Sequence, residues 1–188
     1  MSADAPQLRR ARVDDVPAIG AIINDAAEFG LMLPKSYAQL YENVREFVVA
    51  VDGRDRVVGT CGLSIIWADL AEVVSLAVSV EQRGKGLGRK LVEAVLDEAR
   101  ELKIRRVMSL TYEQAFFEKL GFAVVDRAQL PMKVWADCVR CPKNEACDEI
   151  AMIREFEDIT PSPEAPPPTA PASVEPPVML TNLTTGQS

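Results

Sequence analysis

Hydrophobic and polar positions alternate along this chain with the periods of short strands and amphipathic helices. Runs rich in β-branched and other apolar residues predict strands at 8–13, 47–51, 57–66, 73–78, 105–111 and 123–126. Apolar residues three or four positions apart predict helices from about 16 to 26, over 36–44, over 87–102 and over 113–120. Strands and helices that alternate in this way indicate an α/β protein.

The C-terminal segment has a different composition. Eight of the 13 prolines lie between Pro161 and Pro177, among Ala, Ser and Thr and without a periodic apolar pattern. Such a segment cannot bury enough apolar surface to offset the entropy lost on ordering. We therefore expect one domain over residues 1–158 and a disordered Pro-rich tail over 159–188, which is either passive or a docking peptide.

A glycine-rich turn joins the strand at 73–78 to the helix that begins at Leu87. Its sequence is Arg83-Gly84-Lys85-Gly86-Leu87-Gly88, followed by Arg89. Alternate glycines let the backbone approach a ligand closely, and the start of a helix adds a partial positive charge. The turn therefore predicts an anion cradle that the three cationic side chains reinforce.

Two phosphate-binding motifs do not fit this turn. The nucleotide P-loop pattern Gly-x-x-x-x-Gly-Lys-Ser/Thr is absent, and the glycine spacing is not the Gly-x-Gly-x-x-Gly of dinucleotide-binding proteins. A glycine turn without a ligand remains an alternative.

The turn resembles the Gln/Arg-x-x-Gly-x-Gly/Ala motif of the GCN5-related N-acetyltransferases (GNAT), and residues 115–122 resemble that family's late helix and strand. The resemblance covers about residues 7–156. It implies the GNAT fold, a mixed sheet of about six to seven strands flanked by helices, and acetyl-CoA held by backbone amides of the turn.

Charge and composition exclude several classes of function. The net charge of −7 argues against a nucleic-acid or membrane binder, and the chain has neither a long apolar run nor a signal-like N-terminus. We therefore expect a soluble cytoplasmic protein. The chain contains no histidine, which excludes histidine-based catalytic triads and histidine metal ligands.

Within the GNAT family, the chain most resembles the short stand-alone N-acetylglutamate synthases of arginine biosynthesis. The resemblance rests on four groups of residues: 33–36 with 40–42, 67–72 with 75–78, 110–112 with 116–122, and 130–138 with 141–143. It implies L-glutamate as the acetyl acceptor and acetyl-CoA as the donor. Family members commonly form homodimers, which we expect here too.

Direct attack of an amine on a thioester requires a base and polarisation of the thioester oxygen. Leu76, Ala77 and Val78 end the strand before the cradle, so their backbone groups can pair with pantetheine and offer an N–H to that oxygen. Glu72 lies on the same strand and is the candidate general base, as similar acetyltransferases use a carboxylate here. Its alternative role is that of an ordinary solvated strand residue.

Many relatives place a tyrosine that protonates the departing thiolate at the position that Phe117 occupies. Without that phenol, either Tyr112 takes this role or the thiolate leaves without a protein acid. Tyr112 is also an ordinary strand residue.

Lys35 and the adjacent Ser36 are the candidate residues for the acceptor's carboxylates, because similar synthases have a basic residue at the position of Lys35. Lys35 can equally be a solvated loop residue. Similar sequences usually have Arg or Lys at the position of Val74, and this difference leaves the acceptor's identity open. Transfer to another amine, or a CoA-binding sensor without chemistry, are the alternatives.

Three cysteines, Cys138, Cys141 and Cys147, lie close together, and Cys61 is distant. A closed zinc site would need a fourth ligand from Cys61, Asp148 or Glu149. Reduced thiols without a metal are the favoured interpretation, so we predict no metal site.

Overall fold

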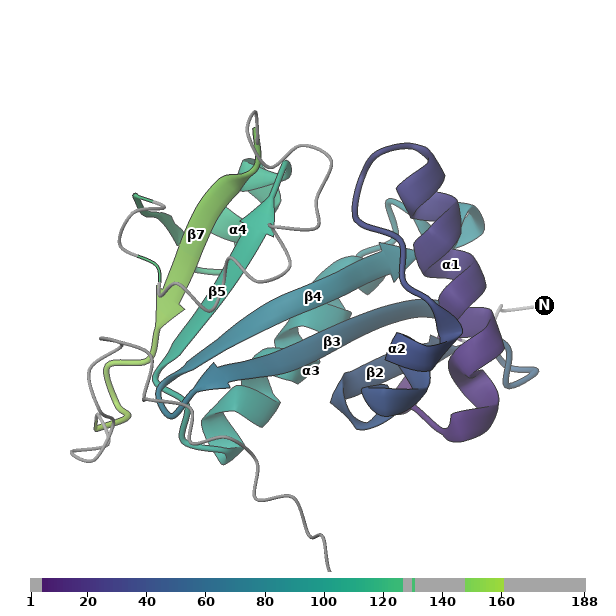
Figure 1. Ribbon diagram of the computed structural model, residues 1–188, viewed down its shortest axis with the longest axis horizontal. Helices are drawn as coiled ribbons and strands as arrows, with labels where there is room; N and C mark the ends of the chain where they lie inside the picture. Colours follow the sequence, from purple (N-terminus) through teal and green to yellow (C-terminus); the bar gives the residue numbers. More distant parts are fainter. Residues whose placement is uncertain (1–4, 127–129, 131–147, 161–188) are drawn as a thin grey trace, which may run out of the picture.

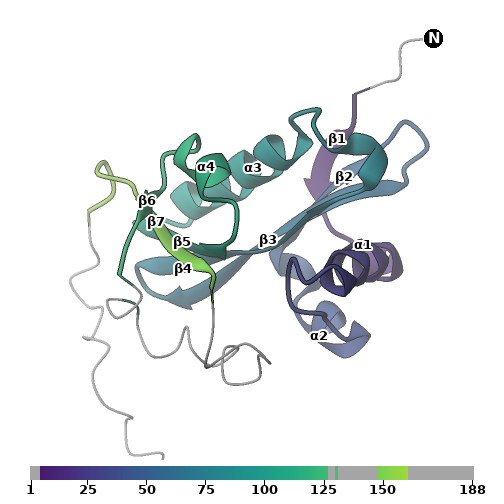
Figure 2. The same cartoon turned by 90° about the horizontal axis from the view of Figure 1, so that it is seen from above.

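The computed structural model describes residues 5–126, 130 and 148–160. These residues form a seven-stranded mixed sheet with the order β1-β2-β3-β4-β5-β7-β6. Helices α1 and α2 cover one face of the sheet, and α3 and α4 cover the other (Figures 1 and 2). This is the α/β architecture expected from the resemblance to the GNAT fold.

The strands are β1 Gln7–Arg10, β2 Phe47–Val51, β3 Val57–Trp67, β4 Leu70–Val78, β5 Arg106–Thr111, β6 Ala123–Val124 and β7 Ile150–Glu155. The α-helices are α1 Val16–Glu28, α2 Tyr37–Glu42, α3 Leu87–Glu101 and α4 Gln114–Glu118. Three short 3₁₀ helices are η1 Val13–Asp15, η2 Val44–Glu46 and η3 Val80–Gln82.

The structure corrects several predicted boundaries. The first strand stops at Arg10, and β4 begins at Leu70 rather than Val73. The sequence analysis predicted no strand at 150–155, where β7 pairs with β5 along its whole length. Pairing between segments this far apart in the chain depends on tertiary context that local patterns do not carry. Beyond residue 160, the predicted Pro-rich tail lies outside the described residues.

Two hydrophobic cores hold the sheet between its helices. On one face, the buried stripe of α3, which includes Leu91 and Val95, packs against Leu63 of β3 and Val73 of β4. On the other face, Ile19 and Ile23 of α1 belong to the core that includes Phe47 and Val49 of β2. Burial on both faces fixes which side chains of β3 and β4 point to which helix layer.

The sheet divides into two arms at the boundary between β4 and β5. Their parallel pairing runs from Leu70↔Arg106 to Glu72↔Met108, and β5 then continues with β7 on its other side. Figure 1 shows the two strands diverging from this point. The β3–β4 ladder also shifts register where Ser75 adopts a φ of 54°, which marks a bulge in β4. We call the space between the diverging strands the fork.

A paired arginine and aspartate join β1 to the beginning of α1. Arg9 donates to both carboxylate oxygens of Asp15, at 2.6 and 2.9 Å, and the Arg12 N–H donates to Asp15 at 2.7 Å. Asp15 is the N-cap residue of α1, but its side chain makes no cap hydrogen bond to that helix. The carboxylate is instead the anchor of the N-terminal strand, and the hydrogen bonds from Arg9 lower its pKa.

We predict that Asp15→Asn lowers the free energy of unfolding at pH 7 by about 1 to 3 kcal/mol, because Arg9 then lacks a charged partner. The matched control is Asp55→Asn, since Asp55 also contacts Arg9 but is exposed; we expect a loss below about 1 kcal/mol there. Denaturant titrations of the three proteins provide the comparison.

The same pair predicts a pH dependence. Folding lowers the pKa of Asp15. Its contribution to the free energy of unfolding is therefore complete above the unfolded-state pKa of about 4 and is lost as the pH falls through the lower native-state pKa. The stability difference between wild type and Asp15→Asn should therefore shrink in acid. Equal losses of stability in Asp15→Asn and Asp55→Asn would contradict this account. So would a stability difference between wild type and Asp15→Asn that is the same at pH 3 as at pH 7.

Candidate functional site

The predicted anion cradle lies at the start of α3, directly after β4 and η3. Gly84 and Gly86 have φ values of 73° and 79°, and Gly86 is the N-cap residue of α3. A Cβ atom at either glycine would meet no other atom within 4 Å. The first N–H groups of a helix lack partners within it, so this open backbone can bind an anion as the glycine pattern predicts.

Cationic side chains surround the cradle, but two of them already have partners. Arg83 donates through Nε to the carbonyl of Val78 at 3.3 Å, and Arg89 binds Glu93 at 2.7 Å. Lys85 is exposed. The backbone N–H groups and the helix dipole are therefore the fixed part of the cradle, and the side chains add adjustable charge.

The second arm of the fork reaches the cradle through α4. A Cβ at Gly88 would lie 3.8 Å from Phe116 and 3.9 Å from Val78. Phe116 therefore lies against the first turn of α3, close to the end of β4. This contact joins α4 to the helix start that carries the cradle.

Leu76, Ala77 and Val78 lie on β4 beyond its last pair with β5. In the described part of the chain, the β5 side of this segment carries no strand, while Ala77 still pairs with Thr60 of β3 on the other side. A backbone edge therefore runs from the cradle towards Glu72. Such an edge can hydrogen-bond an extended ligand as a neighbouring strand would.

Glu72 occupies the point at which the fork begins. It pairs with Ser64 on β3 and with Met108 on β5, and it is half-buried. Its neighbours Ala71 and Val73 belong to the core on the α3 side. Because strand side chains alternate, Glu72 points to the face that α1 and α2 cover.

Two polar residues that were not predicted from the sequence belong to this part of the sheet. Ser64 is directly opposite Glu72 in the β3–β4 ladder, and Glu46 ends η2, which contacts β3. Burial raises the pKa of Glu46, whereas the Lys35 ammonium and the Ser64 hydroxyl act in the opposite direction. We call Glu46, Ser64 and Glu72 the polar row. The register of the β3–β4 hairpin would have identified Ser64.

The two candidate acceptor residues differ in what the structure shows of them. The positive charge of Lys35 lowers the pKa of Glu46, a member of the polar row, against the effect of burial. Ser36 is the N-cap of α2: its hydroxyl accepts from the Gln39 N–H at 3.3 Å and donates to the Gln39 side chain at 3.1 Å. A contact of Ser36 with the acceptor stays a prediction.

The two aromatic residues considered for proton donation occupy different environments. Tyr112 directly follows β5 and is half-buried. Phe117 is 4% exposed and packs edge-on against Phe116 and Phe122, with 5.1 Å between ring centres in each case. Phe117 therefore belongs to the core, and Tyr112 remains the candidate proton donor.

The clustered cysteines Cys138, Cys141 and Cys147 lie outside the described residues. Cys61 is fully buried in the core on the α3 side, where burial raises the pKa of its thiol. Among residues 5–126, 130 and 148–160, no group of three or more side chains could hold a metal ion. Within the same ranges, every helix is too short or too polar to cross a membrane.

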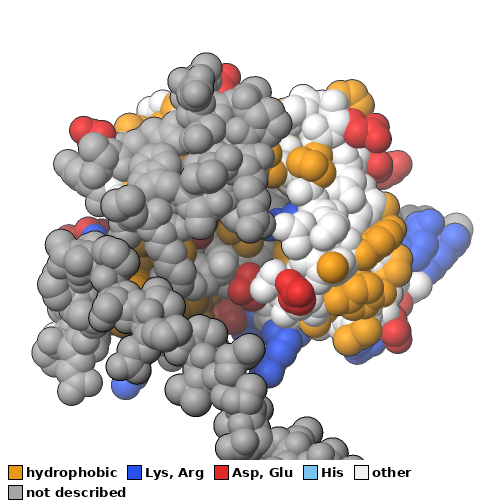
Figure 3. All heavy atoms as spheres, in the orientation of Figure 1, with side chains coloured by type: hydrophobic (Ala, Val, Ile, Leu, Met, Phe, Trp, Pro, Cys, Tyr) orange, Lys and Arg blue, Asp and Glu red, His pale blue; other side chains and the backbone are white. Residues whose placement is uncertain are grey.

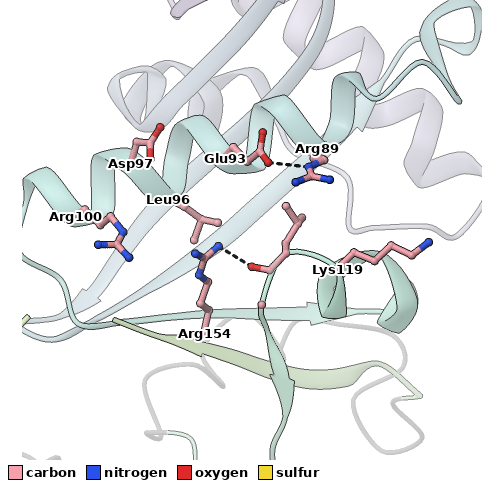
Figure 4. A pocket seen from close by; sticks show the side chains of 9 residues that line it. Arg89, Glu93, Leu96, Asp97, Arg100, Lys119 and Arg154 are labelled. Carbon is pink, nitrogen blue, oxygen red and sulfur yellow. Dashed lines mark hydrogen bonds and ion pairs between the residues drawn. The ribbon is translucent and has the colours of Figure 1, made fainter. Parts of the chain in front are cut away.

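A pocket of about 540 Å³ lies between α3, the turn after α4 and β7 (Figure 4). Its lining includes the cations Arg89, Arg100, Lys119 and Arg154 and the anions Glu93 and Asp97. Arg154 donates to the carbonyl of Leu120 at 2.6 Å, one of the two contacts drawn in Figure 4. Neither Glu72 nor Lys35 lines this pocket, so it is distinct from the fork.

Comparisons with known proteins agree with this geometry. Residues 19–122 match the model of the acetyltransferase (GNAT) family. An uncharacterized N-acetyltransferase of Chlorobaculum tepidum is 40% identical over 78% of this chain and 94% of its own length. The amino-acid acetyltransferase of Mycobacterium tuberculosis is 37% identical over 72% of this chain and 78% of its own length.

Two solved structures share the fold. A Mycobacterium tuberculosis protein in complex with CoA has a TM-score of 0.71 and 32% identity, over 80% of this chain and 99% of its own. The N-acetylglutamate synthase of Neisseria gonorrhoeae, in complex with coenzyme A and N-acetyl-glutamate, has a TM-score of 0.72 and 26% identity. That match covers 80% of this chain and 35% of the longer synthase.

The positive φ of Gly86 yields a prediction about the cradle. Gly86→Ala should weaken CoA binding about tenfold, because an L side chain disfavours the backbone conformation that aims the first N–H groups of α3. Isothermal titration calorimetry with CoA measures the effect. The matched control is Gly30→Ala, since Gly30 also has a positive φ, of 70°, and open surroundings but lies after α1.

Both glycine variants should lose about 1 kcal/mol of stability, and CoA affinity should fall for Gly86→Ala alone. Unchanged CoA affinity in Gly86→Ala would remove the cradle from the binding site.

Proposed function

The chain belongs to the acetyltransferase (GNAT) family, and we propose that it transfers the acetyl group of acetyl-CoA to the α-amino group of L-glutamate. Acetyl-CoA is the donor that the family uses, and the structural neighbours were solved with CoA. The observation that carries the proposal is the position of Glu72. It is a half-buried carboxylate at the start of the fork, with the cradle at one end, and the charge of Lys35 acts on Glu46 of the polar row.

On the donor side, we assign the pyrophosphate to the N–H groups of residues 86–89 and to Arg83, Lys85 and Arg89. The open backbone of residues 76–78 would pair with the pantetheine arm. The fit rests on the open glycine backbone and on the β4 edge that faces the fork. When bound, acetyl-CoA supplies an activated thioester carbonyl.

The chain's own groups then perform three tasks in a ternary complex. Glu72 removes a proton from the acceptor's ammonium, directly or through water. A backbone N–H of the β4 edge hydrogen-bonds the carbonyl oxygen as it gains negative charge. The amine nitrogen forms a bond to the acetyl carbon while the carbon–sulfur bond breaks, and Tyr112 offers a proton to the departing sulfur.

The choice of glutamate is supported by the amino-acid acetyltransferase and N-acetylglutamate synthase relatives and by the cation Lys35. A different amine is the second candidate, favoured by the two carboxylates of the polar row and by Val74, an apolar residue in β4. We further propose that the enzyme acts in the cytoplasm, in arginine biosynthesis, as a homodimer.

CoA release from acetyl-CoA by the purified chain tests the acceptor. L-Glutamate is compared with the other standard amino acids and with a polyamine. Saturable release confined to glutamate supports the proposal. CoA release with another amine would support acetyltransferase activity but show that glutamate is not the acceptor. Measurable binding of acetyl-CoA without CoA release in the presence of any amine would favour a CoA sensor.

Glu72→Gln should lower kcat at neutral pH by roughly 100-fold or more, the usual loss on removing a general base. The loss should narrow at high pH, where the acceptor amine loses its proton to solvent. Glu101→Gln, at the exposed end of α3, serves as the control and should behave as wild type. A pH–rate profile of Glu72→Gln that matches wild type at every pH would exclude this role.

Tyr112→Phe should reduce kcat by about 10- to 100-fold and leave the KM for both substrates nearly unchanged, because the phenol acts on the departing sulfur. Tyr41→Phe is the control, since Tyr41 is an exposed tyrosine of α2. Steady-state kinetics separates the two parameters. An unaltered kcat in Tyr112→Phe would mean that the thiolate leaves without a protein acid.

A further inference from the structure

Two hydrogen bonds attach the backbone of Lys35 to α1. The Asn24 side chain donates through Nδ2 to the Lys35 carbonyl at 3.1 Å, and the Lys35 N–H donates to Asn24 Oδ1 at 3.0 Å. The amide of Asn24 thus satisfies both backbone groups of one loop residue, as a paired strand would. Both residues are half-buried.

In the rest of the α1–α2 loop, Met32 packs against the core that includes Ile19 and Ile23, and three other apolar side chains are largely exposed. Phe29, Leu31 and Leu33 are 77%, 48% and 40% exposed. Hydrophobic side chains gather on the face of the molecule where α1 and α2 lie (Figure 3). The position of Lys35 therefore depends strongly on its two bonds to Asn24.

The charge of Lys35 acts on the polar row. It lowers the pKa of Glu46, as does a hydrogen bond from the Ser64 hydroxyl, and Ser64 is paired with Glu72 across the β3–β4 ladder. Asn24 is thus linked to the candidate base through the Lys35 backbone, the charge of Lys35 and the register of Ser64. None of these residues belongs to the donor cradle, which lies at the start of α3 on the opposite face (Figure 2).

We propose that Asn24 is a positioning residue that sets acceptor selectivity, because it fixes the Lys35 backbone so that the ammonium can bind a carboxylate of the acceptor. The inference rests on the proposed function, since it assumes an acidic acceptor beside Lys35. A fixed cation binds a carboxylate with less loss of conformational entropy than a mobile one. Replacement of Asn24 should therefore weaken binding of the acceptor and leave binding of acetyl-CoA unchanged.

The test compares Asn24→Ala with wild type. We expect the KM for L-glutamate, and its Kd for CoA-saturated protein by calorimetry, to rise about tenfold or more. The KM for acetyl-CoA should stay within about twofold, and the preference for glutamate over glutamine should fall. Asn43→Ala is the matched control, because Asn43 makes one side-chain bond to the Gln39 carbonyl, at 2.9 Å, and none to Lys35.

A double-mutant cycle with Lys35→Met separates positioning from general support of the helix. If Asn24 acts through Lys35, adding Asn24→Ala to Lys35→Met should not raise the glutamate KM further. Asn24→Asp keeps the oxygen that accepts the Lys35 N–H, so it should give an intermediate rise and covers the case in which Asn24→Ala folds poorly.

Three results would overturn the inference. They are additive effects on the glutamate KM in the double-mutant cycle, equal rises of the KM for acetyl-CoA and for glutamate in Asn24→Ala, or an unchanged glutamate KM in that variant. Failure of the proposed function looks different, because wild type would then turn over another amine and not glutamate. In that case the KM of the same variants is measured with the amine that wild type uses. An acceptor KM that does not change in Asn24→Ala again rejects the role of Asn24.

Discussion

The loss of pairing between β4 and β5 after Glu72 is the constraint on which the rest of the site depends. Backbone N–H and C=O groups inside a protein need partners, yet the described β4 edge at residues 73–78 has no strand on its β5 side. A bulge at Ser75 interrupts the β3–β4 ladder, and β7 pairs with the edge of β5 that faces away from β4. The unused hydrogen-bonding capacity of β4 is therefore what a ligand in the fork can satisfy.

The two sides of the fork are supported in different ways. The donor side rests on α3, whose buried stripe packs into the sheet, and on Phe116, which approaches the first turn of that helix. The proposed acceptor side rests on the loop between α1 and α2, where Asn24 holds the Lys35 backbone and Met32 packs against the core under α1.

Much of the backbone of the candidate donor site was predictable because it is local in sequence. An apolar strand, alternate glycines and an amphipathic helix follow one another without interruption, so the pattern itself predicts the open turn at the start of α3. Glu72 was found through family resemblance, and its side-chain direction follows from strand alternation.

The acceptor side was not predictable in the same way. Ser64 meets Glu72 only through the register of a hairpin, Glu46 reaches Ser64 from the chain before β2, and Asn24 reaches Lys35 across eleven positions. The strand β7 was missed for the same reason, since it pairs with β5 about forty residues earlier in the chain. Polar contacts between distant segments leave no periodic signal.

The most direct measurement of the central claim is an NMR titration of the labelled protein with CoA, following backbone amide shifts. If the fork and the start of α3 form the donor site, the largest changes should occur at residues 76–78 and 87–89. Changes concentrated around Arg100 and Arg154, with residues 76–78 unaffected, would place CoA in the pocket between α3 and β7 and contradict the account.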